Sequence, residues 1–221
     1  MGNSNSADLG TVLQSPSGPM RALDASWIAP APTCVHVKAA LAGTSAAVTN
    51  AATNTEVYTF KAKVFSSRTF LKGPEGQILV TVKKNAFSSK FHVFPGDQTE
   101  HEQFMIRDAS GIFNTMLLVA DYFDHKTGCP CRVVAKGSPS KRVVVCYLER
   151  GSPRLSQLQN SEDFLTNVGC YQPIGRFNRE KKFIGRDEYE VEAPAGVDVT
   201  LLLLIWHVRQ VLLDAERSSN A

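Results

Sequence analysis

The first six residues carry the pattern with the most specific chemistry in the chain. Residues Met1–Ser6 read MGNSNS and match the Met-Gly-x-x-x-[Ser/Thr] pattern for N-myristoylation. Removal of Met1 would expose the unhindered amine of Gly2, which is the group that this acylation needs. The sequence therefore predicts Gly2 as a lipidation site. One myristoyl chain binds membranes weakly, with a constant of about 10⁴ M⁻¹, so stable attachment requires a second signal from the rest of the chain.

Two groups of cations are candidates for that second signal. Lysines and arginines that converge beside a hairpin attract anionic headgroups, phosphoinositides included, by about 1 kcal/mol each. The candidates are Lys83, Lys84 and Lys90 in one group and Arg176, Arg179, Lys181 and Lys182 in the other. The alternative is that they are solvated side chains on strands and turns, where lysine also protects edges from mispairing. The sequence leaves both interpretations open.

The cysteines also admit two interpretations, a zinc site and free thiols. His125, Cys129 and Cys131 lie close together in the sequence, and imidazole and thiolate are the usual ligands of zinc. Their spacing matches no common structural zinc pattern, and a fourth ligand would have to come from Cys146 or Cys170. The five cysteines are an odd number without framework spacing, and no apolar signal segment precedes them. We therefore expect reduced thiols, no metal and a cytoplasmic location.

No pattern of residues identifies an active site. The chain has no Gly-x-Ser-x-Gly, phosphate-binding loop, dinucleotide fingerprint or His-Glu-x-x-His, the motifs that mark common catalytic and nucleotide sites. His207 lies in an apolar segment, which is typical of a hydrogen-bonded core histidine. We expect no enzyme activity, no catalytic residue and no cofactor. The net charge of +3 is too small to indicate a nucleic-acid partner, and we expect a monomer.

An apolar segment near the C-terminus dominates the prediction of structure. Residues Val199–Trp206 are apolar on every side of a helix, and such a helix must be enclosed by protein or by lipid. The segment is well short of the roughly 20 residues that span a bilayer, and polar residues flank it from Asp198 to Gln210. We therefore predict a helix over Val199–Leu213 in the middle of a β-rich domain.

Short strands are predicted throughout the region before this helix. Many segments alternate apolar and polar residues, as in Tyr58–Val64, and frequent Gly and Pro turns separate them, as in Lys72–Gly76. This pattern is typical of a barrel or a sandwich. Residues 1–26 are rich in Ser, Gly, Asn, Ala and Pro without apolar periodicity, and they predict a flexible tail. The folded domain is predicted over residues 27–217.

Several segments resemble the LURP-one-related family. They are Tyr58–Arg68, Gly76–Lys84, Cys131–Gly137, Ile184–Val191 and Pro194–Leu204. The resemblance implies a mainly β, tubby C-terminal-like fold, a closed antiparallel barrel of about twelve strands around the hydrophobic C-terminal helix. Closure of the barrel agrees with the residue pattern, because it removes strand edges and supplies the wall that an apolar helix needs.

The resemblance also sets expectations about function. Phospholipid scramblases and tubby proteins are remote relatives by fold, so the resemblance implies association with membrane lipids and no enzyme activity. The chain has no acidic segment like the proposed calcium-binding stretch of scramblases, which argues against lipid scrambling.

We therefore expect a non-enzymatic, lipid- or phosphoinositide-binding protein or signalling and defence adaptor. It would be tethered at the cytosolic face of a membrane and would meet anionic lipids and an unidentified protein partner. The alternative is a small-ligand carrier or an uncharacterised enzyme with a pocket at the barrel mouth. Converging polar groups with perturbed ionisation in such a pocket would favour this alternative.

Overall fold

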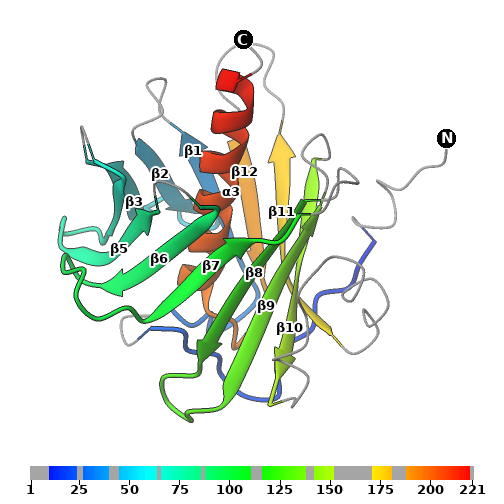
Figure 1. Cartoon of the computed structure of the whole chain (residues 1–221). Helices are drawn as coiled ribbons and strands as arrows, with labels where there is room; N and C mark the ends of the chain where they lie inside the picture. Colours follow the sequence, from blue (N-terminus) through cyan, green and yellow to red (C-terminus); the bar gives the residue numbers. More distant parts are fainter. Residues whose placement is uncertain are drawn as a thin grey trace, which may run out of the picture.

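The structure, a computed structural model, describes residues 10–23, 27–39, 45–63, 66–85, 88–110, 116–137, 142–151, 171–180 and 188–219. Within these residues, twelve antiparallel strands form a closed barrel around a C-terminal helix (Figure 1). The strands are β1 (Thr33–Ala39), β2 (Ser45–Asn50), β3 (Glu56–Ala62), β4 (Arg68–Lys72), β5 (Ile78–Lys84), β6 (Lys90–Pro95), β7 (Phe104–Asp108), β8 (Met116–Phe123), β9 (Pro130–Gly137), β10 (Val143–Arg150), β11 (Gln172–Glu180) and β12 (Glu188–Ala193), and the helix is α3 (Val199–Ser219).

Each strand pairs with the next in the chain, and β1 pairs with β12 to close the barrel. The mainly β, closed, antiparallel architecture predicted from the sequence is confirmed. Alternation along the strands sets the two faces of the wall: in β5, Val80 and Val82 are buried inside whereas Lys83 is exposed. The predicted turn before β5 is also present, and it includes Gly76 at a φ of 81°, a left-handed conformation that favours glycine.

Helix α3 occupies the barrel interior, as Figure 1 shows. Every residue of Val199–Trp206 is buried, and the Trp206 ring packs 5.8 Å from Phe60 of β3 and 5.5 Å from Tyr189 of β12, between ring centroids. Gly175 of β11 lets the wall approach the helix, because a Cβ there would lie 2.7 Å from Leu202 Cδ1. The helix continues past the predicted end to Ser219 with an exposed last stretch. Among the described helical residues, none forms a stretch long and apolar enough to cross a membrane.

Residues 10–23 differ from the flexible tail that composition predicted. They lie along β11 and against the end of the barrel where α3 begins, which we call the covered end. Met20 and Ala22 are fully buried and Leu23 is 1% exposed. Backbone hydrogen bonds hold the segment, from Met20 N to the Gly196 oxygen at 2.9 Å and from Gln14 N to the Pro173 oxygen at 2.7 Å. Such contacts leave no periodic pattern in a sequence, which is why periodicity missed them.

Candidate functional site

A cavity of about 470 Å³ opens at the other end of the barrel, where α3 emerges. We call this end the mouth. The lining residues belong to β1–β6, β12, the β3–β4 connection and α3 from Trp206 onward. A volume of this size falls within the range of about 300–1,000 Å³ that is typical of small-ligand sites.

The bottom of the cavity is apolar and aromatic. Phe60, Phe91, Val82 and Trp206 contribute to it, together with the imidazole of His207. The His207 ring stacks on Phe60, with ring centroids 4.8 Å apart and an angle of 14° between the planes. Burial lowers the pKa of His207 from 6.5 to about 4. The imidazole is therefore neutral at pH 7, with one nitrogen that donates a hydrogen bond and one that accepts.

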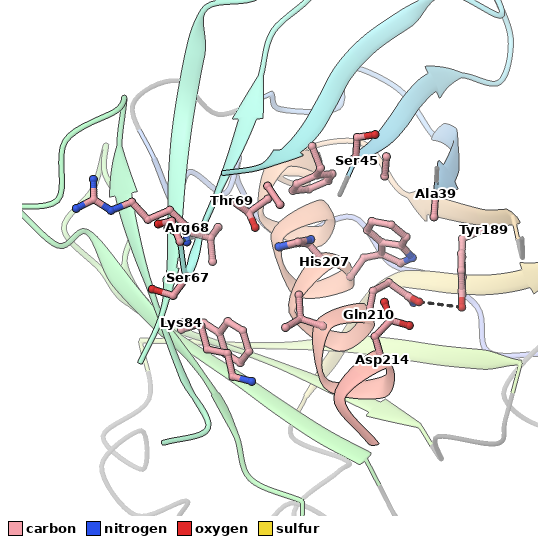
Figure 2. A pocket seen from close by; sticks show the side chains of 18 of the residues that line it. Ala39, Ser45, Ser67, Arg68, Thr69, Lys84, Tyr189, His207, Gln210 and Asp214 are labelled. Carbon is pink, nitrogen blue, oxygen red and sulfur yellow. Dashed lines mark hydrogen bonds between the residues drawn. The ribbon is translucent and has the colours of Figure 1, made fainter. Parts of the chain in front are cut away.

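The upper wall of the cavity carries hydroxyls and cations. The hydroxyl residues are Ser45, Ser66, Ser67 and Thr69, and the cations are Arg68, Lys84 and Arg217. Asp214, an acid of the same lining, contacts Arg217 at 3.4 Å. Thr69 and Lys84 face His207 across the cavity in Figure 2, whereas the side chain of Arg68, which lies opposite the outward-facing Lys83 in the register, extends away from it. The positive charge of this wall therefore exceeds the negative charge.

The barrel topology explains why cations gather at the mouth. In a barrel of consecutive antiparallel strands, alternate connections share one end, so β3 and β5 end, and β4 and β6 begin, at the mouth. Exposed lysines lie near these strand ends: Lys61, Lys63, Lys83 and Lys90. Cations of the first predicted group therefore lie near the mouth.

The structure separates the members of the first predicted group. Lys83 and Lys84 are neighbours in β5 and point to opposite faces of the wall, so Lys84 lines the cavity and Lys83 lies outside. The ammonium of Lys84 lies 5.9 Å from the centre of the Phe91 ring, within range of a cation–π contact. Lys90 is exposed on the outer face of β6.

The second predicted group is only partly described. Arg176 forms an ion pair with Glu192 on the outer wall, at 2.6 Å, and is not part of the cavity lining. Arg179 lies near the mouth end of β11. Lys181 and Lys182 lie outside the described residues, as does Gly2.

Arg209 places a further cation inside the barrel, and the sequence analysis did not select it. It is 1% exposed, and Tyr189 is its described neighbour. The guanidinium carbon lies 5.5 Å from the centre of the Tyr189 ring, and the Tyr189 hydroxyl is 3.2 Å from Gln210 Oε1. Burial lowers the pKa of Arg209, although Tyr189 opposes this shift.

Among the described residues, His125, Cys129 and Cys131 do not form a group whose ligand atoms come close enough to share an ion. His125 and Cys129 lie at the β8–β9 connection and Cys131 lies in β9, where burial raises the pKa of its thiol to about 11. Cys34, Cys129, Cys131 and Cys146 form no disulfide in the described part of the chain, and Cys170 lies outside the described residues. In the described part of the chain, Cys34, His36 and Glu190 are the group whose ligand atoms come close enough to share an ion.

The fold and the cavity together define a closed barrel with an enclosed helix and a cationic mouth. The family model of LURP-one-related proteins matches residues 34–208, and the chain belongs to this family, as the residue patterns predicted. The X-ray structure of an Arabidopsis thaliana protein is similar, with a TM-score of 0.56 and 16% identity, covering 84% of this chain and 94% of that one. At this identity the similarity shows the fold alone. No curated protein matches the chain.

Proposed function

We propose that this protein is a non-enzymatic lipid-binding adaptor that docks on anionic membranes through the barrel mouth. The observation that carries the proposal is the cavity at the mouth, with an apolar bottom and an upper wall of hydroxyls and cations. A phosphorylated lipid headgroup, of which phosphoinositides are the best-matched class, has the complementary chemistry. Its phosphates suit Lys84 inside the cavity and Arg68 on the outer face of the mouth, since guanidinium and ammonium groups bind phosphate through charge-assisted hydrogen bonds.

The lower part of the cavity suits the apolar part of the same ligand. Phe60, Val82 and Trp206 offer aromatic and aliphatic surface, and the neutral imidazole of His207 adds a donor and an acceptor without adding charge. The exposed lysines around the mouth supply long-range attraction to an anionic surface, at about 1 kcal/mol for each cation that comes near it. A bound headgroup and the membrane surface would therefore both contact the mouth of the barrel.

The course of the N-terminal segment is compatible with a second anchor at this end. The segment follows β11 toward the mouth as residue numbers fall: Gln172 Nε2 contacts the Ser15 oxygen at 2.6 Å, and Arg176 Nη1 contacts the Thr11 oxygen at 3.4 Å. Gly2 precedes Thr11 by nine residues, a reach of at most about 30 Å for extended chain. An acyl chain on Gly2 can thus enter the membrane that the mouth contacts.

Co-sedimentation with vesicles tests this function. The full chain, myristoylated or as Gly2→Ala, is mixed with neutral phosphatidylcholine vesicles and with vesicles that also contain a phosphoinositide. We expect Gly2→Ala to abolish binding, because each signal alone is marginal. The double variant Arg68→Gln/Lys84→Gln should bind the anionic vesicles more weakly and with less sensitivity to salt. Lys126→Gln, at an exposed position of the covered end, is the matched control and should bind normally.

Two results would contradict the proposal. One is an acylated wild-type protein that ignores the phosphoinositide vesicles. The other is a loss of binding in Lys126→Gln as large as that in the double variant, which would show unspecific attraction. Mass spectrometry of the protein from its native cell tests the acyl group on Gly2 separately.

A soluble-ligand carrier is the second candidate, and the size of the cavity and the neutral His207 favour it. Calorimetry with a free inositol phosphate separates the two: a carrier binds the free ligand and leaves vesicles in solution, whereas the adaptor also sediments with them. An enzymatic role has less support, because a histidine with a pKa of about 4 is a weak general base at neutral pH.

A further inference from the structure

We propose that the outer wall of the barrel carries a zinc-binding site formed by Cys34, His36 and Glu190. The three residues come from β1 and β12, the strands whose pairing closes the barrel. Cys34 and His36 are two positions apart in β1 and share the outer face, since Val35 and Val37 are fully buried on the inner one. Glu190 lies directly opposite His36 in the register. The site is therefore separate from the cavity at the mouth and does not depend on the proposed function.

The distances suit a single ion. One ligand atom from each side chain, a thiol sulfur, an imidazole nitrogen and a carboxylate oxygen, lies within 4.8 Å of the other two. Around tetrahedral zinc, bond lengths of about 2.0–2.3 Å place neighbouring ligand atoms roughly 3.3–3.6 Å apart. Small rotations of the three side chains can bring their ligand atoms from the observed separation to the separation that zinc needs. The residues lie on strands, which hold ligand positions more rigidly than loops do. All three residues are partly exposed, so an ion can reach them.

The charges on this face leave Glu190 in a distinct position. Three glutamates point outward from β12. Glu188 contacts Lys38 at 3.4 Å and Glu192 contacts Arg176 at 2.6 Å, so both are paired with cations. Glu190 instead accepts a 3.3 Å hydrogen bond from the neutral amide of Asn178. The carboxylate of Glu190 has no cation beside it like those of Glu188 and Glu192 among the described residues, and it is therefore suited to bind a divalent cation.

The donor set indicates which metal fits. Thiolate, imidazole and carboxylate together are typical zinc ligands, whereas calcium and magnesium prefer oxygen alone. Three protein ligands leave the fourth tetrahedral position to water or to a group from a partner. The alternative is an ordinary cross-strand contact between His36 and Glu190 beside a thiol that binds no metal, and a metal titration distinguishes the two.

The test uses the full chain, reduced and freed of metal, titrated with Zn²⁺ by calorimetry and with Co²⁺ by absorption spectroscopy. We expect one ion per chain and a thiolate-to-cobalt charge-transfer band. Cys34→Ser should remove that band. His36→Gln and Glu190→Gln should each weaken zinc binding by at least about tenfold, since loss of an outer-shell contact already costs about 10–100-fold. Far-UV circular dichroism checks that each variant is folded. We expect folded variants, because the substituted side chains point outward from the barrel.

Cys129→Ser removes another partly exposed thiol and is the matched control, with no expected change. A charge-transfer band that persists in Cys34→Ser and disappears in Cys129→Ser would refute the assignment. So would the absence of stoichiometric binding by the wild-type protein, or zinc affinity that is unchanged in both His36→Gln and Glu190→Gln.

Discussion

The two ends of the barrel differ in how their polar groups are paired. At the covered end, the buried carboxylates of Asp198 and Asp124 accept hydrogen bonds from backbone groups of the N-terminal segment. At the mouth, Lys84 lines a cavity and its ammonium lies against the Phe91 ring. The same helix serves both ends, because Val199–Ile205 are core and residues from Trp206 onward line the cavity. We therefore expect substitutions at the covered end to change the stability of the fold and substitutions at the mouth to change ligand binding.

Two aspartates organise the covered end. Asp198 is fully buried and accepts hydrogen bonds from Leu201 N at 3.0 Å and from Ala22 N at 2.9 Å. It therefore caps α3 and attaches the N-terminal segment at once. Asp124, which is 1% exposed, accepts hydrogen bonds from Arg21 N and from Thr127. Burial would raise the pKa of Asp124, but these bonds and the charge of Arg150 lower it.

The mouth shows the reverse pattern. Arg209 is buried beside the Tyr189 ring, and Lys84 lines the cavity. Buried or clustered cations are unfavourable unless something pairs with them. Sites with such perturbed groups are enriched in function.

The largest expected effect is in the helix core. Leu203 is fully buried in α3, and Leu203→Asp would bury a charge without a partner, at a cost of several kcal/mol, about 4 or more. We expect the variant to unfold or aggregate. Ala215→Asp, at an exposed position of the same helix, is the control and should melt like the wild type. Thermal denaturation followed by circular dichroism measures both, and a folded Leu203→Asp protein would contradict the interior position of the helix.

The next effect concerns Asp198 at the covered end. Asp198→Ala removes a helix cap, at about 0.5–2 kcal/mol, and leaves the buried Ala22 N–H unpaired, at about 1–3 kcal/mol. We expect a loss of about 3 kcal/mol in the free energy of unfolding, measured with urea. Protease cleavage within residues 10–23 should also become faster. If cleavage stays at the wild-type rate, Asp198 does not hold the N-terminal segment.

The sequence predicted the strands and the buried helix better than it predicted the cavity at the mouth. An apolar helix and alternating strands are local patterns, so the closed barrel and the position of Val199–Trp206 followed from them and from the family resemblance. The cavity brings together Phe60, Lys84 and His207, which are far apart in the chain. Their convergence depends on strand register, which no local pattern contains.

Some of the missed features did have a local signal. Alternation in β5 assigns Val80, Val82 and Lys84 to one face and Lys83 to the other, so the two lysines could have been separated from the sequence. The same period of two places Cys34 and His36 on one face of β1. Glu190, however, becomes their neighbour only through the β1–β12 pairing that closes the barrel.

The pH dependence of stability should report on the mouth. The folded pKa of His207 is about 4, against 6.5 for an ordinary histidine. Between pH 4 and pH 6.5, His207 binds a proton more readily in the unfolded chain than in the folded protein. The stability that depends on a neutral His207 is therefore fully present above pH 6.5 and is lost as the pH falls toward 4. The loss amounts to at most about 3 kcal/mol. The pKa of Asp124 is lowered from 3.8, so the stability that Asp124 contributes is retained across this window and is lost only at lower pH.

Urea unfolding across this pH window measures the effect, with His207→Gln as the comparison. Glutamine does not titrate, so the variant should lose much less stability between pH 6.5 and pH 4. Parallel pH profiles for the two proteins would show that the His207 imidazole is already accessible to protons in the folded state.

The smallest expected effect compares one substitution at both ends. Arg150 at the covered end donates hydrogen bonds to the Gly18 and Pro19 oxygens, at 3.2 and 3.1 Å, and to Asp124 at 2.9 Å. Arg150→Gln should lower the free energy of unfolding by about 2 kcal/mol, because bonds to charged groups are worth about 1.5–3 kcal/mol each before solvent exposure is discounted.

Arg68 at the mouth has no described carboxylate partner, so Arg68→Gln should change stability by less than about 0.5 kcal/mol while weakening binding to phosphoinositide vesicles. Urea unfolding and vesicle co-sedimentation on both variants give the full comparison. If Arg68→Gln destabilises the protein as much as Arg150→Gln does, the mouth contributes to folding in the same way as the covered end, and the division between a stabilising end and a binding end is wrong.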